Sequence, residues 1–239
     1  MFNGHAEISA QDIATVSTVQ LMPLGTLGVT ADRRFFRYGN ANTAAAVPAG
    51  QLAVAEAAAA NHTNLAVVAD AAVGATSLTV TLGATAATVD QYAEGLIYFN
   101  AGTGQGSHAR IKGHGSAALS TALIVYLAEP LAVAITAATT KASLQKNPWK
   151  DVILSTTVSK ACGVPRVSVA ALSYGWFQTR GIAPVLAGSL AIAKGLTVSQ
   201  GTVTAGTVLA TAAATSPVVG MTVEAAVATE SRVIDLCID

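Results

Sequence analysis

A glycine-rich stretch, GTGQG at residues 102–106, is the first pattern in the sequence that could serve chemistry. Loops of this kind cradle phosphate groups with main-chain amides, but a nucleoside-triphosphate loop ends in Gly-Lys-Ser/Thr and a dinucleotide loop opens a helix. Here the chain continues as SHARIK at residues 107–112, which has the composition of a strand. We therefore predict the tip of a β-hairpin at this position and no bound cofactor.

Histidines and cysteines could bind a metal ion, so their spacing is informative. His108 and His114 flank one predicted hairpin strand, but no cysteine or carboxylate lies near them at the spacing of zinc ligands. A zinc site needs three or four converging ligands, so we expect both histidines at the surface and no metal site. Cys162 and Cys237 lie far apart, and two cysteines do not make a disulfide framework, so we expect two reduced, packed thiols.

The catalytic groups of hydrolases are typically a serine triad or paired carboxylates. The local signature Gly-x-Ser-x-Gly is absent, and chain order alone cannot define a triad. Asp90 and Glu94 form one of the few close acidic pairs, as glycoside hydrolysis would require. Their spacing and the adjacent Gly95 instead favour a solvated loop. The sequence predicts no catalytic residues, and we expect the protein not to be an enzyme.

Residues 32–38 (DRRFFRY) form the densest mixture of charged and aromatic side chains in the chain. Arginine and aromatic residues are enriched at the anchors of protein interfaces. On this basis we predict that a partner protein is contacted by Arg33, Arg34, Phe35, Phe36, Arg37 and Tyr38. The alternative is an edge strand with Phe35 directed inward and the arginines in solvent.

A second aromatic segment, residues 174–181 (YGWFQTRG), is predicted to be a core strand in which Trp176 fills the interior. The same strand could also line an interface between subunits. The residues assigned to this core or interface are Tyr174, Trp176, Phe177 and Arg180.

The composition limits the class of protein. Hydrophobic residues make up 52% of the 239 residues, but aromatic residues only 5% and charged residues only 11%. Each core contact is therefore small, because alanine and valine bury little area. Such a monomer would be only modestly stable, and burial between subunits would compensate, so we expect an oligomer. Low charge also indicates a surface that is covered by partners.

Nucleic-acid and membrane proteins are disfavoured by the charge and hydropathy patterns. The formal net charge is +0 and no basic stripe is present, so we expect no nucleic-acid partner. No apolar run reaches the ~20 residues of a membrane-spanning helix, and the longest candidate, residues 119–138, contains Glu129 and Pro130. The N-terminus lacks the pattern of a signal peptide. We expect a soluble protein with no membrane partner, made in a cytoplasm.

Short strands separated by turn residues must position all of these side chains. Residues 77–82 alternate between polar and apolar, and residues 95–100 and 107–112 are predicted as the two strands of a hairpin. Turn signals at intervals of about 8–12 residues continue to the C-terminus, which is typical of β-sandwiches and β-barrels. We find no strict internal repeat in the sequence.

We therefore predict an all-β fold in three consecutive parts. Residues 1–50 are expected to form an extended N-terminal arm that carries the docking segment. Residues 51–150 are expected to form a β-rich domain, and residues 151–239 a C-terminal β-barrel or β-sandwich domain. Strands do not alternate with long amphipathic helices, which disfavours an α/β fold.

The two aromatic segments resemble those of a group of tailed-phage virion proteins that are encoded near the major capsid gene. In that group Leu-Gly-Thr precedes Asp-Gly-Arg and Phe-Arg-Tyr, and this chain has LGT at residues 24–26 and DRRFFRY at residues 32–38. Arg33 stands where the group has glycine, so the turn there could differ. The likeness extends over residues 23–239 and includes GATSLTVT at 74–81, GQG at 104–106, KNPW at 146–149, YGWFQTRG at 174–181 and VGM at 219–221.

The resemblance implies a capsid decoration (cement) protein built from tulip-like β-barrel or β-sandwich modules, without catalytic residues. Such a protein binds the outside of the capsid and stabilises the shell by bridging capsomers. Its partners would be the major capsid protein and other copies of itself, with a homotrimer favoured at three-fold positions. It would reside on the capsid surface of the virion after assembly in the host cytoplasm. The alternative is another virion component, such as a head fibre, a tail protein or a baseplate protein, in one version with host-glycan binding.

Overall fold

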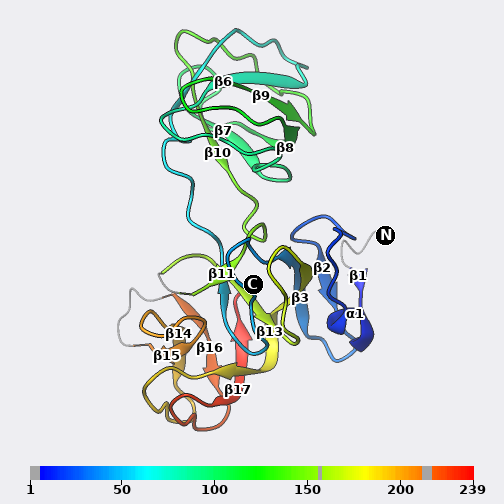
Figure 1. Ribbon diagram of the computed structural model, residues 1–239, viewed down its shortest axis with the longest axis vertical. Coiled ribbons are helices and arrows are strands. Elements are labelled where there is room, and N and C mark those ends of the chain that lie inside the picture. The colour runs from blue at the N-terminus through cyan, green and yellow to red at the C-terminus, as the bar shows by residue number, and fades with distance from the viewer. Residues whose placement is uncertain (1–5, 156–157, 212–216) are drawn as a thin grey trace. The chain divides into compact units, whose positions relative to one another are not determined.

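The structure is a computed structural model that describes residues 6–155, 158–211 and 217–239. It confirms the all-β fold, because these residues form seventeen strands and one short helix, α1 (Ala10–Ala14) (Figure 1). The chain divides into two compact units. The first unit comprises Met1–Glu56 and Pro148–Asp239, and the second unit, Ala57–Asn147, is inserted between these two stretches.

This division differs from the three consecutive parts expected from the sequence. The first fifty residues are not an extended arm, because they contribute β1 (Ala6–Glu7), β2 (Leu27–Val29) and β3 (Phe35–Asn40) to the large sheet of the first unit. The chain after residue 150 returns to the same sheet, where β13 (Tyr174–Leu186) pairs with every residue of β3. Such long-range pairing depends on which faces bury together, and local composition does not reveal it.

Within the first unit, two groups of five strands share one strand order. Repeat A has the order β3-β13-β12-β4-β11, and repeat B has the order β13-β17-β16-β14-β15. The long strand β13 serves both repeats, pairing with β3 through its first half and with β17 through its second half. The other bounds are β4 (Ala53–Val54), β11 (Ile153–Leu154), β12 (Ala161–Pro165), β14 (Thr197–Gln200), β15 (Val208–Ala210), β16 (Val218–Thr222) and β17 (Ser231–Cys237).

Main-chain hydrogen bonds outside the strands also match between the repeats. Parallel bridges from Ala41 to Val152 and from Ala187 to Val208 join the last strand of each repeat back to its first. Two further pairs of N–H···O bonds are equivalent. Gly50 donates to Pro165 in repeat A (3.0 Å) as Gly195 donates to Thr222 in repeat B (3.0 Å). Ser155 donates to Leu52 in repeat A (3.1 Å) as Thr211 donates to Thr197 in repeat B (3.0 Å). The first unit is thus a structural duplication. Few residue identities mark it, because the matched contacts are made by the main chain.

The second unit is a closed barrel with the strand order β10-β5-β6-β9-β8-β7. Its strands are β5 (Leu65–Val67), β6 (Ser77–Thr81), β7 (Leu96–Ala101), β8 (His108–His114), β9 (Ala122–Leu127) and β10 (Lys141–Gln145). Alternate residues, among them Val80, Ile97, Phe99 and Val125, fill the interior. The expected hairpin is present as β7 and β8, with residues 102–106 at its tip.

Four pairs of loop residues, which we call the loop bridges, exchange both of their main-chain hydrogen bonds. These pairs are Val47 with Val169, Ile192 with Ala226, Ala71 with Ile135, and Ala87 with Ala117. All eight N···O distances lie between 2.8 and 3.0 Å. Repeats A and B contain one loop bridge each and the inserted barrel contains two. The same pair of main-chain hydrogen bonds therefore joins loops in repeat A, in repeat B and in the barrel.

A left-handed turn accompanies nearly every loop bridge. The residue three positions after the bridging residue has positive φ in seven of the eight loops, at Gly50, Gly74, Asp90, Ser120, Leu172, Gly195 and Thr229. The turn aims the amide of this residue at the opposite loop, so that Gly74 N–H donates to Leu131 O at 2.8 Å and Ser120 N–H to Gly83 O at 2.7 Å. Non-glycine residues adopt this conformation at a cost of about 1 kcal/mol.

Replacing Gly74 by alanine should lower the free energy of unfolding of the second unit by about 1 kcal/mol, because φ at Gly74 is +87°. Gly115 is the matched control, since it lies in the same unit, lacks a positive φ and, like Gly74, has no atom within 4 Å of an added Cβ. Chemical denaturation should show Gly115→Ala as neutral or slightly stabilising. Equal losses in both variants would contradict the role given to the left-handed turn.

Candidate functional site

The two aromatic segments singled out in the sequence are neighbouring strands. Strands β3 and β13 run antiparallel, with Tyr38 opposite Trp176, Phe36 opposite Gln178, and Phe35 opposite Arg180. Strand β3 also pairs with β2 on its other side, so it is a central strand and not an edge strand. The pairing brings the predicted docking segment and the predicted core segment into one surface.

One face of this strand pair belongs to the core. Phe36, Tyr38 and Trp176 are buried and pack with Ile8 and Ile13 of the N-terminal segment. The rings of Tyr38 and Trp176 meet edge to face, with centroids 5.3 Å apart. Phe36 and Tyr38 are therefore unavailable for the partner contact predicted for them. The alternative expectation was also wrong in one respect, because Phe36 and not Phe35 is the fully buried residue of the pair.

The hydroxyl of Tyr38 is held within this core by the N-terminal segment. The main-chain N–H of Leu21 donates to the Tyr38 hydroxyl oxygen at 3.1 Å. Burial raises the pKa of Tyr38 above its usual value. The ring of Tyr174 stacks on the ring of Tyr38, with centroids 6.1 Å apart. Tyr38 is thus a neutral structural residue whose phenol binds the main chain.

Arg37 is also committed to contacts inside the first unit. Its Nη1–H donates to Gly25 O at 3.0 Å, and its Nε–H donates to the Asp239 carboxylate at 2.5 Å. The guanidinium lies 5.2 Å from the centroid of the Trp149 ring, and the ammonium group of Lys160 lies at the same distance from that ring. Trp149 therefore contacts two cations, and Arg37 fixes the C-terminus against β3.

The turn before β3 presents the remaining arginines. Arg33 is exposed with φ +64°, a left-handed conformation that the glycine of the resembling group would adopt without strain. Arg34 forms an ion pair with Asp32 at 2.8 Å. Hydrogen bonds from the Thr30 hydroxyl and then from Arg34 lower the pKa of the Asp32 carboxyl. Arg33 therefore places an exposed charge at a left-handed position of this turn.

A pocket of about 480 Å³ opens beside Arg34, where repeats A and B meet on β13. Arg166, Ser231 and Pro184 line the pocket together with Arg34, and Gln178 forms part of its wall. The buried Gln178 amide donates to the carbonyl oxygens of Arg180, Gly181 and Ile182, so this group is already satisfied. Two arginines and a serine in one lining suit a carboxylate or another oxyanion, although the Arg34 Nε–H already donates to Asp32.

Sequence reasoning identified Arg34 but missed Arg166 and Ser231. These three residues come from the turn before β3, the loop after β12 and the first residue of β17. No local pattern connects them, because only the strand order of the two repeats places them around one pocket. Of the second segment, Trp176 and Phe177 lie in the core, whereas Arg180 is exposed with its guanidinium 5.8 Å from the Phe35 ring centroid.

The histidines of the second unit are structural. The expectation of a surface position is wrong for His114, which is buried, although His108 is exposed. His114 Nε2 accepts the main-chain N–H of Tyr92 at 3.0 Å, and its Nδ1 lies 2.7 Å from Gly115 O. This pairing requires the neutral ring protonated on Nδ1. The Tyr92 hydroxyl is bonded in turn to His62, so both buried histidines stabilise the loop before β7.

The acidic pair singled out in the sequence makes contacts within the second unit. Glu94 forms an ion pair with Arg110 at 3.5 Å, and Asp90 accepts the His114 main-chain N–H at 2.9 Å. The described residues include no group of three or more histidine, cysteine, aspartate or glutamate side chains placed to hold a metal ion. Among these same residues, no helix has the length and apolarity to span a membrane.

Comparisons of this chain with models of protein families, with curated proteins and with solved structures found no match.

The two cysteines differ in environment, which corrects the expectation of two packed thiols. Both are free, but Cys162 is buried whereas Cys237 is exposed. Burial raises the pKa of the Cys162 thiol to about 12. A disulfide reagent such as dithionitrobenzoate should therefore modify Cys237 in the native protein and Cys162 only after unfolding. Cys237→Ser should abolish the native reaction, and a rapid native reaction of that variant would contradict the burial of Cys162.

Proposed function

We propose that this chain is a structural accessory protein of a tailed-phage virion that binds the outside of the capsid and stabilises the shell by bridging capsomers. In this proposal the major capsid protein is the binding partner, copies of the chain associate as a homotrimer, and the capsid surface of the virion is its location. The resemblance of residues 23–239 to capsid decoration proteins motivates the proposal.

The pocket formed by Arg34, Arg166 and Ser231 is the observation that carries the docking step. Arg33, next to Arg34 in the sequence, is exposed, and Arg180 lies opposite Phe35 in the same sheet and contacts its ring. Arginine fits planar carboxylates with two parallel hydrogen bonds, so the partner surface should present acidic side chains. The docking residues proposed from the structure are therefore Arg33, Arg34, Phe35, Arg166 and Arg180, without the buried Phe36 and Tyr38.

The duplication within the first unit supports the bridging step. A shell repeats one protein many times, so an accessory protein gains affinity when it binds two neighbouring copies at once. Repeats A and B have the same strand order and the same loop bridges, and they are joined through the continuous strand β13. One chain thus carries two similar bodies in a fixed relation, as bridging of a regular lattice requires.

A second candidate is a different virion component, such as a head fibre, tail or baseplate protein with a receptor-binding role. The observation that favours it is the inserted barrel, whose outer face exposes Leu96, Tyr98, Ile124 and Tyr126. Immunogold electron microscopy of virions separates the candidates, because label on the head supports decoration and label on the tail supports the second candidate.

The double variant Arg34→Ala, Arg166→Ala should bind capsids at least about tenfold more weakly, since hydrogen bonds to charged groups contribute about 1.5–3 kcal/mol each. Co-sedimentation with capsids that lack this protein measures the loss, and wild-type binding should weaken as salt is raised. Arg110→Ala, an exposed arginine of the second unit, is the matched control. Unchanged binding by a folded double variant would remove the docking assignment.

The purified protein should behave as a trimer of 23.9 kDa chains in light scattering coupled to size exclusion. Self-association is expected because large apolar residues such as Ile182 and Met221 remain about half exposed on repeat B, at 50% and 47%. A stable monomer at all concentrations would contradict the homotrimer in solution, and a ring of six would favour the tail.

A further inference from the structure

The inserted barrel occupies a position that a short connection fills in the other repeat. Repeat B connects β14 to β15 through residues 201–207, at the place where repeat A connects β4 to β11 through the whole second unit. The five-strand order is the same in both repeats. The barrel is also closed and has a hydrophobic core of its own. A compact module inserted at one connection of a repeated scaffold is a natural place for a separate binding function.

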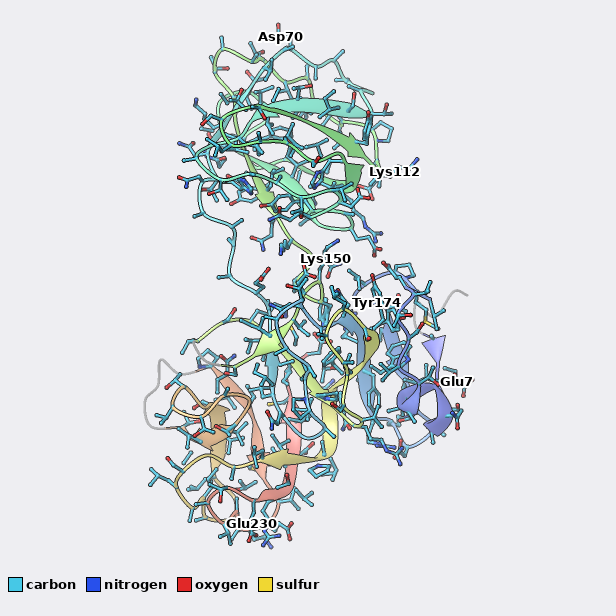
Figure 2. The ribbon with its side chains drawn as sticks, in the orientation of Figure 1. Glu7, Asp70, Lys112, Lys150, Tyr174 and Glu230 are labelled. Carbon is cyan, nitrogen blue, oxygen red and sulfur yellow. The ribbon has the colours of Figure 1, made fainter. Side chains whose placement is uncertain are left out.

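A groove of about 630 Å³ lies on the outside of this barrel. Its walls include Tyr126 of β9, Lys112 of β8 and the loop residues Val89 and Asp90. The side chains of Tyr126 and Val89 are well exposed, at 52% and 65%. Lys112 projects from the barrel surface in Figure 2. The volume is within the range of small-molecule sites, and apolar and polar groups converge in it.

Gly113 keeps the floor of the groove open. It is opposite Tyr126 in the β8–β9 pairing, at a register shift between Ile111 and Gly113. A Cβ at Gly113 would lie 2.7 Å from Asp90 Oδ1, so a larger residue would displace the carboxylate. Because Gly113 has no side chain, the main chain forms this part of the groove, and the bulge places Tyr126 beside the glycine.

The Asp90 carboxylate is held in position by the main chain of His114, close to the loop bridge between Ala87 and Ala117. Asp90 is the left-handed residue three positions after Ala87, with φ +53°. Its main-chain N–H donates to His114 O at 3.0 Å, and its Oδ1 accepts the His114 main-chain N–H at 2.9 Å. A carboxylate fixed by the fold is preorganised for a ligand that must be oriented.

We propose that this groove binds a neutral saccharide. The ring of Tyr126 and the side chain of Val89 offer an apolar surface for the C–H face of a pyranose. Asp90 can accept hydrogen bonds from sugar hydroxyls, and Lys112 can donate to them. Asp90 and Lys112 have opposite charges, so the groove has no net attraction for an anionic or a cationic ligand. A polyhydroxylated neutral ring satisfies all four side chains.

Saturation-transfer NMR on the full-length protein tests the proposal with glucose, galactose, mannose and N-acetylglucosamine at millimolar concentration. At least one sugar should receive saturation from the protein, and Tyr126→Ala should weaken its binding by about tenfold. Asp90→Asn should also weaken it, while retaining an acceptor for His114 and a residue type that tolerates positive φ. Tyr98→Ala is the control, since Tyr98 is exposed on β7 but does not line the groove.

The proposal is overturned if none of these sugars receives saturation, or if Tyr126→Ala and Tyr98→Ala bind equally well. It is independent of capsid docking, because the Arg34→Ala, Arg166→Ala variant should bind the sugar as the wild type does. Loss of sugar binding in that variant would place the saccharide at the arginine pocket and overturn the assignment to the barrel. Circular dichroism of each variant establishes that the barrel is folded.

Discussion

Reciprocal main-chain hydrogen bonds between loops are the constraint on which this fold depends. The chain is rich in alanine and poor in aromatic residues, so side-chain burial contributes little at each position. Val47 and Val169 in repeat A, Ile192 and Ala226 in repeat B, and two pairs in the inserted barrel exchange both of their hydrogen bonds. Each bridge holds two loops together through main-chain groups alone, so these contacts do not depend on which side chains the loops carry.

Divergence between the two repeats explains where the functional groups lie. Arg37 pairs with Phe177 in repeat A, and Ala183 pairs with Ile234 at the equivalent place in repeat B. Phe36 is fully buried beneath the N-terminal segment, whereas the equivalent Ile182 is half exposed. Repeat A thus carries charge, aromatic rings and a covering segment here, whereas repeat B exposes Ile182 and Met221 on either side of Asp235. The arginine pocket arises where these two surfaces meet on β13.

In the inserted barrel, the residue after one loop bridge also lines the groove proposed to bind a saccharide. The left-handed residues after its bridges include Gly74 and Ser120, which serve the turn alone, and Asp90, which also carries a carboxylate into a groove. An aspartate tolerates positive φ better than most residues, so the turn and the carboxylate are compatible at one position. The buried His62, Tyr92 and His114 then stabilise the adjoining loop from within.

The sequence by itself determined the all-β class and individual strands, because alternation along residues 77–82 and the hairpin at residues 95–112 are local signals. It could not decide whether Phe35 or Phe36 points inward, since a shift of one residue exchanges the two faces of a strand. It also could not place Arg166 beside Arg34, bury His114 or reveal the duplication. Those features depend on pairings between distant strands and on main-chain hydrogen bonds. Many combinations of small apolar side chains are compatible with the same main-chain bonds, so the sequence does not reveal them. Only the tertiary structure therefore decided which residues meet in the arginine pocket and in the groove of the barrel.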